Sequence, residues 1–333
     1  METVRVYQGS AKNVLVFEEP TKDMPGRAAF EFLDYFSVFD WGRFLTDPID
    51  KKGLAQAQVS KKHFELLKEA GIKAHYQGMM NSQTMSVSLF NVPEAYKEVP
   101  PGTTNYLLPI EIIFRIFTYP ESSDLKKIKE GKRTWAELGY DEIPEPNKKL
   151  PRTKISYSTK LEETDRVLTK EEARVLAGLT QREIDKLEGL ALEVEEIVTK
   201  HAAKVNLLHY DGKIEVAKDP EGNFVVVDVV GTLDEDRFMM EAEPGKFVDV
   251  SKQAIRNWFV KEGAWKKQVD EAKKKAEEQG VKDWKSFCPQ PPRLPGDFLK
   301  LISEMYLADA EARTGEKLGA KLTLKEVAKE LHA

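Results

Sequence analysis

The stretch that decides the fold is KIEVAKDPEGNFVVVDVVGTLDEDRF, residues 213–238. Two runs with apolar residues at strand spacing flank the turn Asp219-Pro220-Glu221-Gly222, and this pattern predicts a β-hairpin. The second run is rich enough in valine to be a core strand, yet it contains Asp228. Four charged residues follow it: Asp234, Glu235, Asp236 and Arg237. Such a concentration of charge beside a core strand needs a chemical reason, because unpaired buried charge is costly.

Pairing across the hairpin brings two acids together. If the turn is centred on Pro220 and Glu221, Glu215 pairs with a residue near Val226, and Asp228 lies diagonally across from Glu215 on the same face. Diagonal neighbours are roughly 7–8 Å apart at the backbone. Two part-buried acids this close repel unless one is protonated or a cation bridges them. Mg²⁺ suits the arrangement, because it is commonly held by one or two carboxylates and completes its shell with water and phosphate oxygens.

Cations flank this acidic pair. Lys213 precedes Glu215 by two residues and so shares its face, and Arg237 follows the acidic turn. The alternative is that both acids point to solvent on an edge strand. The flanking cations favour a site for a phosphate-bearing ligand instead.

A second candidate phosphate contact is the turn Gly9-Ser10-Ala11-Lys12, which joins the strand-like runs VRVY and NVLVF. Its small residues would let backbone N–H groups approach phosphate oxygens, and Lys12 would add a charge. An ordinary hairpin turn is the alternative. Neither the Walker A spacing nor GxGxxG occurs.

Arg115 lies in the strand-like run YLLPIEIIFRIFTY, residues 106–119. An arginine among Ile and Phe must find an anionic partner or reach water. Glu111, four residues earlier on the same strand face, could be that partner. The sequence leaves open whether Arg115 forms this structural pair or binds a ligand.

The rest of the sequence contains both strand-like and helical patterns. We expect an N-terminal antiparallel β lobe that includes AAFEFLDYFSVFD (28–40), and a helix from Ser60 to Ala70 with Ser60 as its cap. Residues 120–151 read as a surface excursion with little chemistry, and residues 169–204 as a helix broken near 178–180, with Thr180 as a cap. The C-terminal third is expected to be helical, with one helix from about Asp297 to Thr314.

Composition limits the class of protein. The chain has 333 residues, 41% of them hydrophobic, which is enough for one large core or two to three smaller ones with a cleft between lobes. Its formal net charge is −5, with 51 basic and 56 acidic residues interspersed, so small-molecule ligands are favoured over nucleic acid. No apolar run could span a membrane and no secretory signal is visible, which indicates a cytoplasmic protein. The Glu- and Lys-rich helices hint at a thermophile.

From about Val6 to Gly315, the segments resemble, in their chain order, the phosphoribosylaminoimidazole-succinocarboxamide synthase (SAICAR synthetase) family. YQGSAK resembles the family's phosphate loop YEGKAK, SVFDWGRF with Asp50-Lys51-Lys52-Gly53 resembles its SAFD and KG segments, and LPIEIIFR resembles PLEVVVR. SYSTKLEETDR resembles the PSTK loop, and the opening stretch resembles K(L/I)EF with DEVLTPDSSRF. SKQAIRNWF resembles DKQFLRDW, and PPRLPGDFLKLISEMYLADAEARTG resembles the final PPxLP helix. SVFDWG, STKLEETDR and VVDVVGTLDEDRF are similar to an archaeal branch.

The resemblance implies an α+β fold of the SAICAR synthetase type, with an N-terminal antiparallel β lobe, a mixed α/β central lobe of the ATP-grasp or kinase-like kind, and C-terminal helices. The expected divisions are residues 1–108, with the phosphate loop, 109–260, with the metal and substrate site, and 261–333. The implied reaction joins L-aspartate to carboxyaminoimidazole ribonucleotide (CAIR) through an acyl phosphate, with ATP cleaved to ADP and phosphate, in purine biosynthesis. Family members are often dimers or larger, so a homo-oligomer is expected by analogy.

The resemblance also implies roles for particular residues. Glu215 and Asp228 would hold Mg²⁺ against ATP, with Lys213 beside them as a third catalytic residue. Gly9, Ser10, Ala11 and Lys12 would cradle the ATP phosphates. The expected substrate-binding residues are Arg115, Ser122 or Ser123, Lys160, Arg237, Lys252 and Arg256.

Three departures from the family pattern leave the acidic pair in place. Ser10 replaces a larger residue after Gly9, Val229 replaces the glutamate after the hairpin aspartate, and Arg166-Val167-Leu168 replaces His-Asp-Glu after the PSTK loop. They bear on how aspartate is placed, to which the sequence assigns no residue.

Three alternatives to the ligase remain at this point. A paralogue could amidate another azole nucleotide. A kinase-like phosphotransferase is disfavoured because HRD-type and DFG motifs are absent from the sequence. A nucleotide-binding protein without catalysis would be expected to lack Glu215 or Asp228, and both are present.

Overall fold

The smaller of two sheets is built from the N-terminal part of the chain. The computed structural model describes residues 2–120, 122–163, 165–261 and 264–332. The sheet's strands are β1 (Arg5–Gln8), β2 (Lys12–Glu18), β3 (Gly26–Phe32), β4 (Tyr76–Asn81) and β5 (Thr84–Leu89). They are antiparallel in the order β1-β2-β3-β5-β4, which confirms the antiparallel N-terminal sheet. The strand signal expected up to residue 40 ends at Phe32, because the aromatic residues that follow pack into the core from loops.

The larger sheet has eight strands and is organised around β10. Its strands are β6 (Tyr106–Leu107), β7 (Ile110–Phe117), β8 (Lys149–Thr159), β9 (Val167–Leu168), β10 (Leu207–Lys218), β11 (Phe224–Val227), β12 (Arg237–Glu243) and β13 (Lys246–Asp249). The main path runs β13-β12-β10-β7-β8-β9, and β11 and β6 also pair with β10. The long strand β10 therefore carries the predicted hairpin and connects it to the rest of the sheet.

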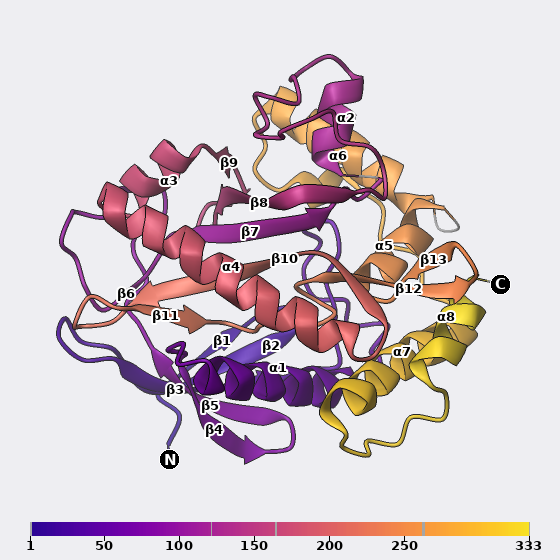
Figure 1. Cartoon of the computed structure of the whole chain (residues 1–333), viewed down its shortest axis with the longest axis horizontal. Coiled ribbons are helices and arrows are strands. Elements are labelled where there is room, and N and C mark those ends of the chain that lie inside the picture. Colours follow the sequence, from indigo (N-terminus) through magenta and orange to yellow (C-terminus); the bar gives the residue numbers. More distant parts are fainter. Residues whose placement is uncertain (1, 121, 164, 262–263, 333) are drawn as a thin grey trace.

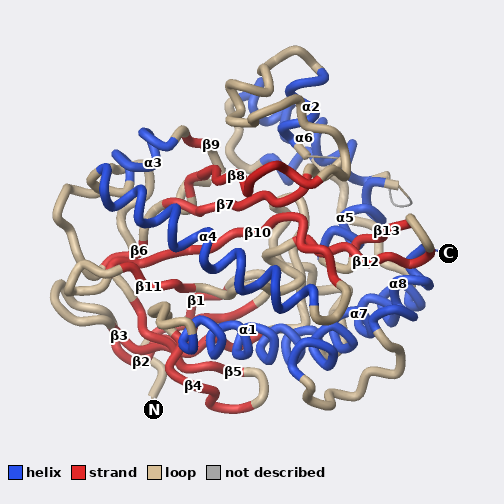
Figure 2. The backbone as a smooth tube through the Cα atoms, in the orientation of Figure 1, coloured by secondary structure: helices blue, strands red, loops and turns tan. Residues whose placement is uncertain are grey.

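Helices cover the two sheets and extend beyond them (Figure 1). They are α1 (Lys52–Glu69), α2 (Ser123–Lys129), α3 (Lys170–Leu176), α4 (Gln181–Ala203), α5 (Lys252–Val260), α6 (Trp265–Gln279), α7 (Gly296–Thr314) and α8 (Leu324–His332), with a 3-10 turn at Trp284–Phe287. Helix α4 packs on β7 and β10, and α1 contacts α4, α7 and the smaller sheet. Figure 2 shows that helices α1 and α4 lie in front of the strands in this view.

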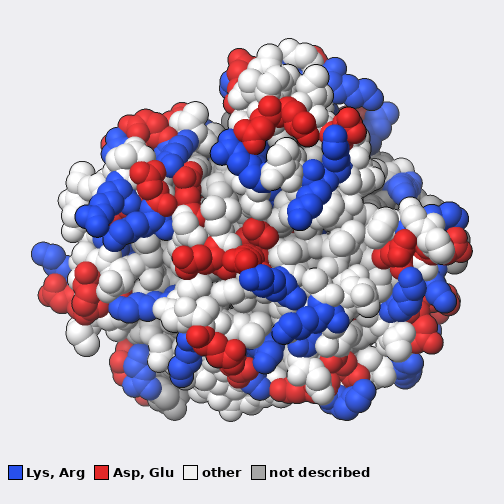
Figure 3. Space-filling view, viewed as in Figure 1, with Lys and Arg blue, Asp and Glu red and all other residues white. Residues whose placement is uncertain are grey.

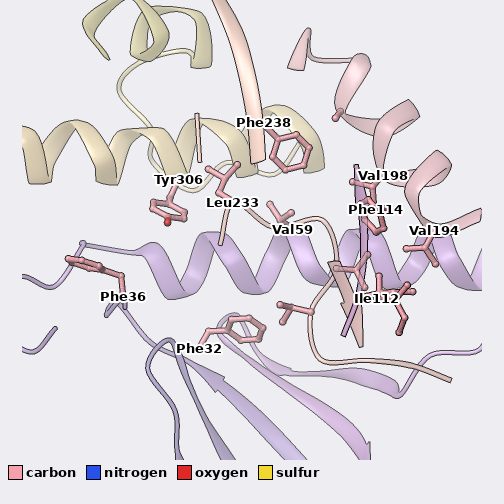
Figure 4. Close-up of a cluster of buried hydrophobic side chains, with 14 of the residues drawn as sticks. Phe32, Phe36, Val59, Ile112, Phe114, Val194, Val198, Leu233, Phe238 and Tyr306 are labelled. Carbon is pink, nitrogen blue, oxygen red and sulfur yellow. The ribbon is translucent and has the colours of Figure 1, made fainter. Parts of the chain in front are cut away.

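The apolar core is continuous between the two sheets (Figure 4). Phe32 from β3, Val59 from α1, Phe114 from β7 and Phe238 from β12 belong to one buried cluster. Helix α1 lies in the middle of this cluster, so it fixes the smaller sheet against the larger one. The divisions after residues 108 and 260 stay predictions.

Most of the predicted elements are confirmed, and the α+β class with them. Helices α3 and α4 break where expected, and Thr180 and Glu183 form a capping box that begins α4. Helix α7 matches the expected C-terminal helix, and α2 falls within the expected surface excursion.

The predicted start of α1 at Ser60 is wrong. The helix begins eight residues earlier, at Lys52, and Ser60 is buried within it. Lys51, at the N-cap, makes no side-chain cap, and the Asp34 carboxylate accepts the Gly53 N–H at 2.8 Å instead. The local sequence carries no capping signal, because the cap comes from a distant loop.

The hairpin is confirmed, but its register differs by one residue from the expected one. Glu215 pairs with Val227, because Lys218 pairs with Phe224 and leaves a five-residue loop between them. Asp228 therefore follows the last paired residue directly and has a left-handed backbone, with φ 64°. Backbone conformation, and not strand alternation, sets the direction of its side chain.

Lys and Arg are interspersed with Asp and Glu on the face shown in Figure 3. Within the described ranges, each helix is too short or too polar to cross a bilayer.

Candidate active site

The two predicted metal carboxylates lie in a buried, lysine-rich part of the cleft. Glu215 is 5% exposed, and the Lys160 ammonium lies 2.5 Å from its Oε1. Lys12, from the start of β2, forms an ion pair with Asp228. His75 contacts the Asp228 backbone carbonyl through Nε2 at 3.0 Å, which helps to fix its left-handed conformation. The pair is thus held between cations from two distant segments, the start of β2 and the loop after β8.

The pKa values of the two acids are shifted in opposite directions. Burial and the charge of Asp228 raise the pKa of Glu215. Burial also acts to raise the pKa of Asp228, but Lys12 and neighbouring lysines outweigh it and hold that pKa well below its usual range. Each acid therefore depends on nearby positive charge to stay ionised.

Three glutamates share the ammonium group of Lys213. It pairs with Glu111, with Glu235 at 3.2 Å and with Glu215 at 3.4 Å. Burial acts to lower the pKa of Lys213, but these carboxylates raise it well above its usual value. Lys213 is therefore a permanent cation beside the acidic pair.

This cation also corrects the expected partner of Arg115. Glu111 does lie on the same face of β7 as Arg115, but it binds Lys213. Arg115 donates to Ser156 Oγ at 2.8 Å and lies 3.8 Å from Asp124.

An apolar pocket of about 90 Å³ adjoins the acidic pair. Glu215 and Asp228 lie at its polar edge, and its lining is otherwise mostly apolar, with Phe30, Leu89, Phe90, Val92, Leu107 and Val227. The sequence analysis missed this pocket, because its members come from separate strands and loops and no single segment carries the pattern.

The predicted phosphate loop lies at a second cavity, of about 300 Å³, whose lining includes residues 7–12. The Gly9 N–H donates to the Lys12 carbonyl at 2.9 Å, which closes the turn between β1 and β2. A Cβ at Gly9 would lie 2.6 Å from that carbonyl oxygen, so the turn requires glycine. The Ala11 carbonyl accepts the Leu33 N–H at 2.8 Å and ties the loop to the core.

A third cavity, of about 480 Å³, lies next to this loop. Five cations line it: Arg115, Lys213, Arg237, Lys252 and Arg256. Burial and the charge of Arg237 lower the pKa of Arg256. Cations confined in this way favour an anionic ligand.

Arg237 is the best-fixed cation of this cavity. Its Nε donates to Asp211 at 2.8 Å in a two-pronged contact, and its guanidinium lies 4.1 Å from the centre of the Tyr119 ring. Asp211 was missed, although the charge inside a predominantly apolar strand could have signalled it.

Some of the predicted substrate-binding residues do not line the larger cavity with the others. Lys160 lies at Glu215 and is not among the residues that line the larger cavity, which leaves its substrate role a prediction. Ser122 caps α2 by accepting the Leu125 N–H at 3.2 Å. Ser123 begins α2, and its side chain lies outside the described part of the chain.

A further charged cluster supports the loop that carries the acidic residues. The Lys52 ammonium lies 2.6 Å from Asp234 Oδ2, and the Tyr306 hydroxyl donates to Asp234 Oδ1 at 2.6 Å. Burial acts against the charge of Asp234, but Lys52 and Lys252 hold its pKa well below its usual range. Sequence reasoning missed this cluster, because its members lie on three distant segments.

The carboxylate pair fits Mg²⁺ as a two-ligand site. Glu215 is buried and Asp228 is half-buried, and both depend on positive charge, as a divalent ion would supply. In the described residues no group of three or more His, Cys, Asp or Glu could hold a metal. The remaining positions around the ion would therefore belong to phosphate oxygens and water.

A cleft with these charges suits an enzyme that brings several anions together, as an ATP-dependent ligase must. The sequence model of the SAICAR synthetase family matches residues 5–272. A protein of Archaeoglobus fulgidus called putative phosphoribosylaminoimidazole-succinocarboxamide synthase is 35% identical, over 97% of this chain and 98% of its own. The Thermoplasma acidophilum phosphoribosylaminoimidazole-succinocarboxamide synthase is 33% identical, over 86% and 93%.

Solved structures show the same fold. A SAICAR synthetase in complex with ADP has a TM-score of 0.62 and 24% identity, over 94% of this chain and 99% of its own. The Saccharomyces cerevisiae SAICAR synthase complexed with SAICAR has a TM-score of 0.67 and 18% identity, over 96% of both chains.

The chain belongs to the SAICAR synthetase family. The fold, the ligase class and the predicted function in purine biosynthesis are confirmed at the level of this family, and the alternative functions are not favoured. The relatives include archaeal thermophiles, in line with the archaeal pattern of the sequence.

Proposed function

We propose that this cleft joins L-aspartate to CAIR, with ATP cleaved to ADP and phosphate, to give SAICAR. One observation carries the assignment of the site. The pair Glu215 and Asp228 lies between an apolar pocket and a lysine-rich space, as a metal–triphosphate site requires. The similar fold solved with ADP supports the use of ATP.

The polarity of the cavities supports a position for the nucleotide. The apolar pocket beside Val227 and Leu107 takes the adenine base, and the turn at Gly9 to Lys12 takes the phosphates. Lys12 forms an ion pair with Asp228, so phosphates bound at this turn would lie beside the acidic pair. Mg²⁺ held by Glu215 and Asp228 would neutralise charge on the transferred phosphoryl group.

The azole nucleotide occupies the larger cavity. Its phosphate and carboxylate bind among Arg115, Arg237 and Arg256, with Lys252 on the same wall. Ser122 completes the phosphate side, and Lys160 reaches the site through Glu215. Arginine suits this task because its fork can bind two oxygens of one anion.

The chemistry follows from the charges. A carboxylate is a poor acyl donor, so an oxygen of the CAIR carboxylate first attacks the γ-phosphorus of ATP, and ADP leaves. The amine of aspartate then attacks the acyl carbon and phosphate leaves. Lys213, a permanent cation, offsets the negative charge of the reacting groups. We also propose that the enzyme acts in the cytoplasm as a homo-oligomer.

Asp228→Asn tests the metal site. One charge removed at about 4 Å in an environment of effective dielectric about 20 is worth about 4 kcal/mol, or about a thousand-fold in rate. Turnover is measured with ATP, Mg²⁺, CAIR and aspartate by following SAICAR directly. Glu221→Gln removes an exposed carboxylate from the same hairpin and should leave turnover unchanged. Normal turnover in a folded Asp228→Asn enzyme would contradict the assignment.

A further inference from the structure

The wall between the phosphate-loop cavity and the substrate cavity contains the point where the reacting groups must meet. Five residues line both spaces: Ser10, Ser37, Asp234, Glu235 and Lys252. Under the proposed function, the acyl carbon is made reactive by a phosphoryl group that arrives from the first space. The aspartate amine must reach the same carbon, so its binding group belongs to this shared wall.

Two carboxylates lie in the wall, and they are in different states. Asp234 is neutralised by Lys52 and fixed by Tyr306, each at 2.6 Å. Glu235 pairs with Lys213 at 3.2 Å, and two other glutamates share that ammonium. Lys160 neutralises Glu215 at 2.5 Å, so Lys213 is left to Glu111 and Glu235. One cation cannot neutralise both of these carboxylates, so Glu235 keeps part of its negative charge at the junction.

The other carboxylates around the larger cavity are committed elsewhere or lie away from the junction. Asp211 holds Arg237, Asp236 lies 3.1 Å from His209, and Asp40 pairs with Lys273 at 2.6 Å. Asp165 is exposed and does not line the phosphate-loop cavity.

We infer that Glu235 binds the α-ammonium group of the amino-acid substrate, which rests on the proposed function. Aspartate carries one ammonium group and two carboxylates. The junction offers a matching pair, with Glu235 for the ammonium and Lys252 for a carboxylate. In the family motif DEVLTPDSSRF, Ser occupies the position of Glu235, so this carboxylate distinguishes the present chain from that motif.

Glu235 also provides an acceptor for the proton that the reaction releases. The nitrogen bonds to the acyl carbon, and the carbon–oxygen bond to phosphate breaks with its electron pair leaving on the phosphate. Before this attack the ammonium group loses one proton to the Glu235 carboxylate against which it lies, which frees the nitrogen lone pair, and the second proton leaves the nitrogen with the departing phosphate. Glu235 therefore acts on the second half-reaction and not on acyl-phosphate formation.

The test separates the two half-reactions. Glu235→Gln keeps the shape of the side chain and removes its charge. We expect KM for aspartate to rise about 10- to 100-fold, as for the loss of one charge-assisted contact, with KM for ATP and CAIR nearly unchanged. Hydroxylamine, which is largely uncharged at neutral pH, should still trap the acyl phosphate as a hydroxamate at the wild-type rate.

Two further variants sharpen the result. Glu235→Asp keeps the charge and should recover part of the aspartate affinity. Glu243→Gln removes an exposed carboxylate at the far end of β12 and should behave as wild type. If Glu235→Gln lost hydroxamate formation and SAICAR formation equally, the role assigned to Glu235 would be wrong, but the proposed function would stand. A wild-type enzyme that forms neither product would overturn the proposed function, and this inference with it.

Discussion

Asp234→Asn tests whether the buried ion pair holds the active-site loop in place. The pair with Lys52 is 2.6 Å long, and its side chains are 7% and 1% exposed. Asparagine can still accept the Tyr306 hydrogen bond, so the substitution mainly removes charge. Lys52 is then left buried without its counter-ion, which costs about 3–5 kcal/mol. This is a large fraction of a typical unfolding free energy of about 5–15 kcal/mol.

The assay is urea unfolding at neutral pH, followed by circular dichroism. Asp297→Asn is the matched control, because its pair with Lys300 has side chains that are 98% and 80% exposed. The control should lose less than about 1 kcal/mol. In a Lys52→Met background, Asp234→Asn should cost much less, since no lysine is left unpaired. Equal losses in Asp234→Asn and Asp297→Asn would refute the reasoning.

Two other predictions concern substrate binding and pH. Arg237→Ala should raise KM for CAIR about 10- to 100-fold, because a desolvated contact to an anion is lost, and leave KM for ATP unchanged; steady-state kinetics that show no change for CAIR would exclude this role. Burial and the charge of Arg313 lower the pKa of His201 to about 4 from 6.5. The unfolded chain therefore binds more protons between these values, and the free energy of unfolding should fall by about 1.4 kcal/mol per pH unit as the pH drops through this window. His201→Gln should flatten that slope in urea titrations, and an unaltered slope would argue against it.

Short-range patterns were enough for several parts of the fold. The turn at Asp219 to Gly222 and the apolar runs beside it predicted the hairpin. Thr180 and Glu183 lie three residues apart, so the capping box that starts α4 could be recognised locally. These features depend on neighbours in the chain, which the sequence displays directly.

Features that depend on residues distant in the chain are the ones that the sequence did not predict correctly. The start of α1 was misplaced because Asp34, eighteen residues before Lys52, caps the helix. The sequence left open whether Glu111 pairs with Arg115, and it did not indicate Lys213 as the partner of Glu111, because Lys213 comes from an adjacent strand that lies far along the chain. A strand shows which face a side chain occupies, but not which charge the neighbouring strand supplies.

By itself, the sequence determined the α+β class and the hairpin, and it singled out the two acidic residues of the hairpin that are proposed to hold the metal. Only the tertiary structure decided how they meet. Asp228 approaches Glu215 through a left-handed backbone beside His75 and Lys12, and Glu235 reaches the junction of two cavities through the loop before β12. Burial and charge pairing act between residues that are close in space but distant in the chain, so local spacing cannot specify them.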